Sequence, residues 1–406
     1  MWVPESAEEL ERAVTAGALS ETEVFDAKAA MPDPRGNADL AWDVAAMSTD
    51  GGVLLYGVGE DADGRPTVLC PIELKSQRER VDQIVRTSLA EVPYIDVREL
   101  PLEHDPSRGY LLIVVPPSAR APHQVIVKGK YQHRFYGRGP TGNRVLSEGD
   151  IARLYERRQR AEVDREELLR EILRFAPEQT PSADRAHLHA FARPVFPDQA
   201  LWRRARRDGG DQEVVAALAD AARRGAATGG YDPDLRTLGG RWQRQGADAG
   251  RAEVREPRRG PLPQGSRRLD IGEAVELRCD VNIDGRGQLF CRRAAERGPA
   301  SWGSSRLLLI EQVTAGNLAS FFAVMAALYA RADYFGSVDV GLLLTGLEGA
   351  VPLGASSGNP TVYNAAAYSR HDRYAAGALS DAQGVAMDLL GALFEMLWGE
   401  GYSPFT

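Results

Sequence analysis

A six-residue run without a charged side chain, residues 53–58 (Val-Leu-Leu-Tyr-Gly-Val), strongly limits what this chain can fold into. A short apolar run of this kind is typical of a central strand that is buried on both faces. Residues 110–115 have the same character, whereas residues 38–47 and 81–89 carry apolar side chains at helical spacing. The combination predicts a mixed α/β fold, of the α+β kind with a mixed sheet.

The chain has 406 residues, which is too long for one ordinary core and predicts at least two domains. We place a first domain at residues 1–156 and a second α/β domain at residues 181–406. A connector helix at 157–180 joins them, because its first part is almost wholly polar or charged and suits solvent exposure. Residues 224–268 are rich in Gly, Pro, Arg and Asp and predict an irregular segment with one or two short strands.

Composition excludes several classes of protein. No apolar run approaches the roughly 20 residues that a membrane span needs, so no membrane is expected. The first residues lack the basic and apolar parts of a secretory signal, which predicts a cytoplasmic protein. Three cysteines are too few and too scattered for a disulfide framework or a zinc cluster. The net charge of −8 argues against a surface that is basic throughout, but allows a local basic site.

Such a basic site is predicted at residues 118–147, which contain six Lys or Arg residues and no Asp or Glu. If residues 130–138 form a strand, alternation puts Arg134, Tyr136 and Arg138 on one face. Cations that neutralise phosphates and an aromatic ring that stacks on a base are what nucleic-acid binding requires. The alternative is a solvated outer face of a sheet. The candidate nucleic-acid-binding residues are Lys128, Lys130, Arg134, Tyr136, Arg138 and Arg144.

A second candidate site is acidic. Asp26 and Lys28 are two residues apart on a predicted strand, so both side chains project from the same face. There a carboxylate can bind a divalent metal, and a lysine can offset charge that develops on a phosphate. Glu21 has the opposite parity and needs a bulge or turn to join them, and Asp61 and Asp63 follow the central strand. The alternative is an ordinary strand edge and a surface turn.

Together these segments resemble the Schlafen AlbA-type nucleic-acid-binding domain, in a short bacterial form, over about residues 18–156. The resemblance rests on the order of Glu21-x-x-x-x-Asp26-x-Lys28, Met47-Ser48-Thr49-Asp50-Gly51-Gly52, the apolar strand, Ile113-Val114-Val115-Pro116 and Arg134-Phe135-Tyr136-Gly137-Arg138. It implies binding of DNA or RNA. Some members of the family are metal-dependent endoribonucleases that cut structured RNA such as transfer RNA through three acidic residues.

Carried over to this sequence, the resemblance implies Glu21 and Asp26 as the first two acids and Asp61 or Asp63 as the third. Glu21, Asp26 and Asp61 would then hold Mg²⁺ or Mn²⁺, and Lys28 would assist catalysis. The second acid of the family is usually glutamate, and its nucleases pair two lobes around a groove, whereas one lobe is found here. A homodimer would restore the groove. The alternative function is a non-catalytic DNA-binding regulator or assembly module with a C-terminal sensing or interaction domain.

Overall fold

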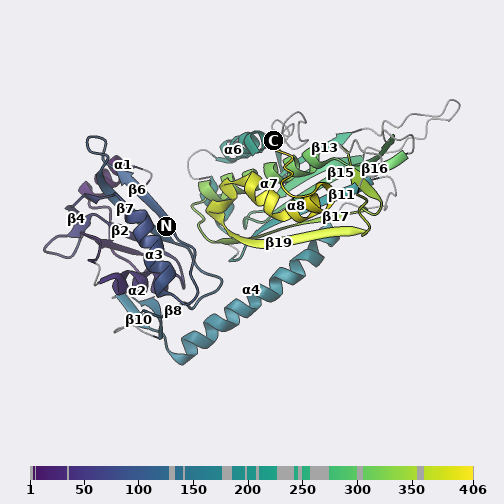
Figure 1. The fold of residues 1–406 in the computed structure, drawn as a ribbon. Coiled ribbons are helices and arrows are strands. Elements are labelled where there is room, and N and C mark those ends of the chain that lie inside the picture. The colour runs from purple at the N-terminus through teal and green to yellow at the C-terminus, as the bar shows by residue number, and fades with distance from the viewer. Residues whose placement is uncertain are drawn as a thin grey trace. The chain divides into compact units, whose positions relative to one another are not determined.

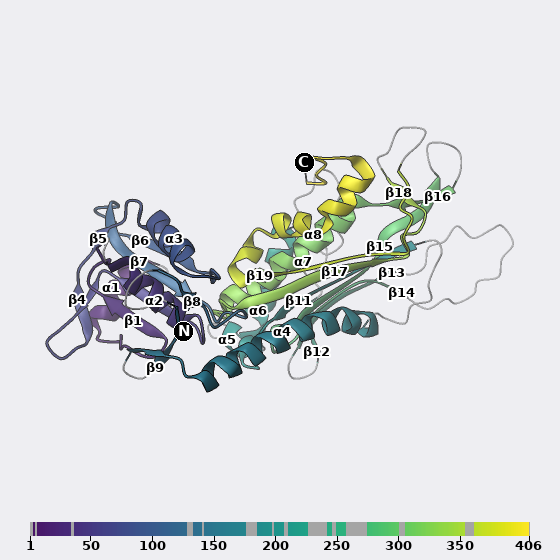
Figure 2. The same ribbon diagram turned by 60° about the horizontal axis from the view of Figure 1, so that its bottom comes forward.

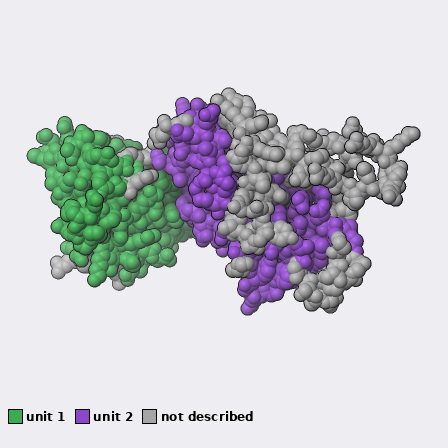
Figure 3. Space-filling model, turned by 90° about the horizontal axis from the view of Figure 1, so that it is seen from above, with its two compact units in different colours: residues 1–164, 335–337 green, residues 165–334, 338–406 purple. Residues whose placement is uncertain are grey.

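The chain folds into two compact units, which Figure 3 colours separately: residues 1–164 with 335–337, and residues 165–334 with 338–406. Both units combine helices with β-sheet, which confirms the predicted mixed α/β class (Figure 1). The computed structural model describes residues 3–4, 6–33, 36–127, 133–139, 142–175, 185–196, 199–206, 210–225, 242–245, 249–256, 274–299, 305–353 and 361–405.

In its described residues the first unit contains three helices and a series of mostly short strands, and the long helix α4 continues into the second unit. In chain order its elements are α1 (Ala7–Thr15), β1 (Phe25–Lys28), α2 (Asn37–Met47), β2 (Gly52–Tyr56), β3 (Val58–Glu60), β4 (Pro66–Leu69), β5 (Ile72–Glu73), α3 (Gln77–Ser88), β6 (Asp96–Pro101), β7 (Arg108–Val115), β8 (Gln124–Val125), β9 (Arg134–Gly139), β10 (Gly142–Val145) and α4 (Glu148–Phe175). The predicted central strand is divided at Gly57, whose φ of 100° ends β2 before β3 begins.

The main sheet of this unit is covered on both faces, as the apolar run predicted. β2 pairs in parallel with β1 and antiparallel with β7. Leu54 and Tyr56 of β2 belong to a core with α2 and α3, whereas Val53 and Leu55 belong to a second core with α1. Because side chains alternate along a strand, the sheet lies between α1 on one face and α2 with α3 on the other. A small sheet of β8, β9 and β10 packs against α2.

The second unit is built on a nine-stranded, largely antiparallel sheet. Seven strands follow the path β12-β13-β14-β15-β11-β17-β19, and β16 pairs with β15 and with β18 off this path. Its helix α7 packs on β15 and β11, with α6 and α8 beside it (Figure 2). In chain order the elements are β11 (Arg185–Pro194), α5 (Leu201–Ala205), α6 (Gly210–Gly225), β12 (Trp242–Gln245), β13 (Ala249–Glu256), β14 (Ala274–Val281), β15 (Gly287–Pro299), β16 (Ser305–Leu309), α7 (Glu311–Arg331), β17 (Ser337–Thr345), β18 (Ala350–Pro352), β19 (Ala367–Ala375), the 3-10 helix η3 (Ala376–Ser380) and α8 (Ala382–Trp398).

Two further sequence predictions concern this unit. β12 and β13 lie within the predicted irregular segment, whose residues 226–241, 246–248 and 257–268 lie outside the described part of the chain. Within that part, α7 alone has the length and hydropathy of a membrane span, and 78% of its apolar window is buried in the unit, as in a core helix.

Candidate functional site

The acidic candidate site begins with two side chains of β1 that face α2. In the parallel pairing, Asp26 lies beside Leu54 and Lys28 beside Tyr56, so both share the face of β2 that α2 covers. The Lys28 Nζ is 3.5 Å from the Asp26 Oδ2, and the two side chains therefore share a face as expected. The same ammonium is 3.2 Å from the Oδ2 of Asp43, which α2 supplies. Lys28 thus lies between two carboxylates from different elements.

Asp43 was not among the residues predicted for the site. Its side chain is 5% exposed, and its Oδ1 accepts a hydrogen bond of 2.6 Å from the Asn143 Nδ2 on β10. Burial raises the pKa of Asp43, while the charge of Lys28 opposes that rise. The sequence did hold a signal, because Asp43 lies among the apolar residues of the α2 helix. A charged side chain is buried there only when another group pairs with it.

Arg138 ties the hairpin β9–β10 to the same site. Its Nη1 donates to the Asp26 Oδ2 at 3.2 Å and to the Asn143 Oδ1 at 3.0 Å. Its Nε and Nη2 donate to the main-chain oxygens of Glu23 and Thr22, both at 3.3 Å. We call Asp26, Lys28, Asp43, Arg138 and Asn143 the charged cluster. With its side chain only 10% exposed, Arg138 is held by the protein itself.

Glu21 joins this region through a turn. An isolated bridge between Thr22 and Phe25 bends the chain ahead of β1. In a continuous strand Glu21 would point to the face opposite Asp26, and this turn brings it to the same side. The main-chain N–H of Ala27 then donates to the Glu21 Oε1 at 3.0 Å. Partial burial raises the pKa of Glu21, and the nearby charge of Asp26 raises it further. The structure therefore brings the first two predicted acids together.

The third predicted acid serves a turn instead. Asp61 accepts hydrogen bonds from the main-chain N–H groups of Asp63 and Arg65, each at 2.9 Å, and from the Thr67 hydroxyl at 2.9 Å. These hydrogen bonds hold the pKa of Asp61 below its usual value. Asp63 is exposed in the same turn. Both acids therefore lie in a turn that is stabilised by its own hydrogen bonds.

The residues present do not fit a bound Mg²⁺ or Mn²⁺ as their side chains lie. Lys28 supplies positive charge between Asp26 and Asp43, at the position where a cation would bridge the two carboxylates. Nowhere in the described ranges do three or more His, Cys, Asp or Glu side chains form a group that could hold a metal ion. The metal site of Glu21, Asp26 and Asp61 stays a prediction.

The basic candidate site differs from expectation at Tyr136. This residue is 3% exposed and packs edge-on against Trp42 of α2, with 5.8 Å between ring centroids. The prediction gave Tyr136 as a base-stacking residue, but β9 packs against α2 and the side chain of Tyr136 is turned inward. The ring of Tyr136 fills the core, where it cannot stack on a base as the structure stands.

The other basic residues remain at the surface. Arg134 is exposed at the start of β9 and forms no ion pair with any residue that the structure describes. Arg144 on β10 is half-exposed, and its Nη1 is 2.7 Å from the Asp150 Oδ2. Lys128 and Lys130 lie outside the described residues. Among the predicted binding residues that the structure describes, Arg134 thus presents the clearest uncompensated charge.

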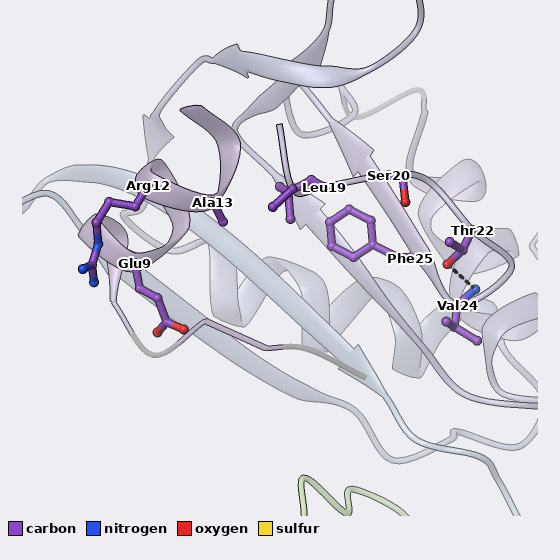
Figure 4. Close-up of a pocket in the computed structure, with 9 residues that line it drawn as sticks. Glu9, Arg12, Ala13, Leu19, Ser20, Thr22, Val24 and Phe25 are labelled. Atoms are coloured by element: carbon purple, nitrogen blue, oxygen red, sulfur yellow. Dashed lines mark hydrogen bonds between the residues drawn. The ribbon is translucent and has the colours of Figure 1, made fainter. Parts of the chain in front are cut away.

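Described residues of this unit line two cavities. One of about 580 Å³ is lined by α1 and the turn before β1: Leu19 and Phe25 lie together in its middle, with Glu9 and Arg12 on the helix at one end (Figure 4). The other, of about 280 Å³, adjoins the charged cluster. It is lined by Lys28, Ala30, Pro32, Asp39, Leu40, Trp42, Asp43 and Tyr56.

Comparison with models of known protein families and with curated proteins found no match to this chain. The family resemblance therefore rests on the residues quoted above.

Proposed function

We propose that the first unit binds nucleic acid through the basic hairpin of β9 and β10. Arg134 carries this proposal, because it is exposed, forms no ion pair with a described residue, and lies in thirty residues without a carboxylate. Arg144 adds a half-exposed cation. Lys128 and Lys130 extend the proposal from the sequence. The charge pattern and the Schlafen AlbA-type resemblance support the same function.

Phosphate contacts explain how such a surface would work. Each cation that neutralises a phosphate releases counterions, so affinity falls with salt, with a slope of about −0.7 to −0.9 per contact. We do not include Arg138 or Tyr136 among these contacts, because Arg138 already binds Asp26 and Tyr136 is buried.

The test is a titration of labelled transfer RNA, single-stranded RNA and duplex DNA, followed by fluorescence anisotropy at several salt concentrations. We expect tight binding at low salt and a roughly tenfold or greater loss in Arg134→Glu, since this change reverses a phosphate contact. Arg78→Glu on the exposed face of α3 is the matched control, with the same change in net charge. Equal weakening in both variants would show that net charge, and not the hairpin, governs binding.

Phosphodiester cleavage is a second candidate function. It is supported by the contact of Glu21 and Asp26 around β1, with the Lys28 ammonium 3.5 Å from Asp26. A fixed positive charge there could stabilise negative charge that develops on a phosphate. The test is incubation of labelled transfer RNA with Mg²⁺, Mn²⁺ or chelator, beside Asp26→Asn. Cleavage that Asp26→Asn abolishes would support this activity, whereas bound and intact RNA would leave a binding protein or regulator.

We further propose that the protein acts in the cytoplasm as a homodimer, whose second copy would supply the second lobe. Light scattering on the purified protein tests the dimer, with a mass of twice 44.2 kDa expected.

A further inference from the structure

The smaller cavity beside the charged cluster has the size and lining of a site for one small ring system. Its volume of about 280 Å³ is just below the roughly 300–1,000 Å³ of sites for drug-sized ligands, which suits a smaller ligand. Pro32, Leu40 and Trp42 contribute apolar and aromatic surface. Such a mixture of apolar walls and a few polar groups is typical of sites that bind a small organic ligand.

Tyr56 supplies a polar group to the lining of this cavity. It ends β2, is 1% exposed and lines this cavity, yet its hydroxyl makes no hydrogen bond with any described residue. The phenol therefore offers one donor and one acceptor to whatever enters the cavity.

The remaining polar groups complement this hydroxyl. Lys28 lines the cavity, and its ammonium, which also contacts Asp26 and Asp43, is a hydrogen-bond donor. The exposed carboxylate of Asp39 lines it as an acceptor and forms no ion pair within the described part of the chain. A nucleobase presents donors and acceptors side by side on its pairing edge, and flat faces that stack on aromatic rings. Tyr56, Lys28, Asp39 and Trp42 supply the matching groups.

We propose that this cavity binds one unpaired nucleobase of the nucleic acid that the hairpin holds by its phosphates. The proposal rests on the proposed function and deepens it: single-stranded or looped segments become the preferred ligands. A paired base cannot enter, because its pairing edge is already occupied and it is stacked in the duplex. Since Lys28 and Asp43 belong both to the cavity and to the charged cluster, a bound base would bring its own phosphate group near Asp26.

The experiment compares two labelled oligonucleotides of about ten nucleotides, one with bases and one with abasic sugars on the same backbone. We expect the wild type to bind the base-containing strand at least tenfold more tightly. Tyr56→Phe should weaken that binding about fivefold, the equivalent of one hydrogen bond of about 1 kcal/mol, and leave abasic binding unchanged. This variant keeps the ring and loses no hydrogen bond to a described residue, so the fold is retained. Asp39→Ala, at an exposed position, is the second variant and should act in the same way.

The outcomes separate the two proposals. Equal binding of the two strands by the wild type would overturn the base pocket and leave phosphate binding by the hairpin intact. Preference for the base-containing strand that survives both Tyr56→Phe and Asp39→Ala would also overturn the pocket. Binding of neither strand would refute nucleic-acid binding itself and, with it, the pocket. Arg134→Glu should weaken both strands alike.

Discussion

Arg138 should contribute mainly to the stability of the first unit, although its position in the basic segment predicted a contact with nucleic acid. The informative change is Arg138→Met, which keeps a long aliphatic side chain and removes the guanidinium. It deletes the hydrogen bonds to Asp26 and Asn143 and those to the main-chain oxygens of Thr22 and Glu23.

The magnitude follows from burial. The side chains of Arg138 and Asp26 are 10% and 13% exposed, and removing one partner of a buried ion pair costs about 3–5 kcal/mol. Lys28 still compensates Asp26 at 3.5 Å, and Thr22 and Glu23 are exposed enough for water to replace the lost donors. We therefore expect the free energy of unfolding to fall by about 3 kcal/mol, the lower limit of that range.

Hydrogen exchange of the β2 amides measures this loss within the first unit, because buried central strands exchange only on global unfolding. A loss of about 3 kcal/mol should lower their protection about a hundredfold. The control is Arg134→Met at an exposed position, expected to change stability by less than about 0.5 kcal/mol. If Arg138→Met left protection unchanged while abolishing RNA binding, Arg138 would be a binding residue and the reasoning would be refuted.

Three further predictions concern stability. Burial lowers the pKa of His189 to about 4 in the folded protein, from about 6.5 when unfolded. The free energy of unfolding should therefore fall by up to about 3 kcal/mol as the pH falls from 6.5 towards 4. Urea unfolding of the wild type and of His189→Gln measures this dependence, which the variant should flatten. Asp339→Ala should destabilise the second unit by about 3 kcal/mol in the same assay, because the buried guanidinium of Arg373 loses its ion-pair partner. Arg223→Ala, which removes an exposed ion pair, should cost less than about 1 kcal/mol. Gly57→Ala should lower the stability of the first unit by about 2 kcal/mol, because φ at Gly57 is 100° and a Cβ would lie 2.9 Å from the Tyr110 ring. The control is Gly149→Ala in α4, where no atom lies within 4 Å of the added Cβ. Equal thermal midpoints for the two variants would contradict the prediction.

The elements with a strong hydrophobic period could be predicted from the sequence, and those without one could not. β2, β7 and α2 bury most of their side chains, and the sequence identified all three. β19 was not predicted, because most of its residues are exposed or half-buried and carry no alternating apolar pattern. A strand of this kind is specified by its neighbours in the sheet more than by its own side chains.

The candidate site shows the same division. Alternation along one strand was enough to place Asp26 and Lys28 on a common face. It could not decide which face of β9 turns inward, since Tyr136 and its opposite neighbours fit either arrangement until α2 is in place. Asp43 was missed for a related reason: its pairing with Lys28 joins a helix to a strand, and no local pattern reports such a contact.

The position of Lys28 also determines its chemical reactivity. Burial alone would lower the pKa of this amine, but Asp43 and Asp26 outweigh burial and raise it. The nitrogen therefore keeps its proton at neutral pH and has no lone pair with which to attack a carbonyl or other electrophile. Amine-acylating reagents should modify the exposed Lys75 well before Lys28. Imine formation and proton abstraction by this lysine are correspondingly disfavoured, and the ammonium acts as a permanent counter-charge.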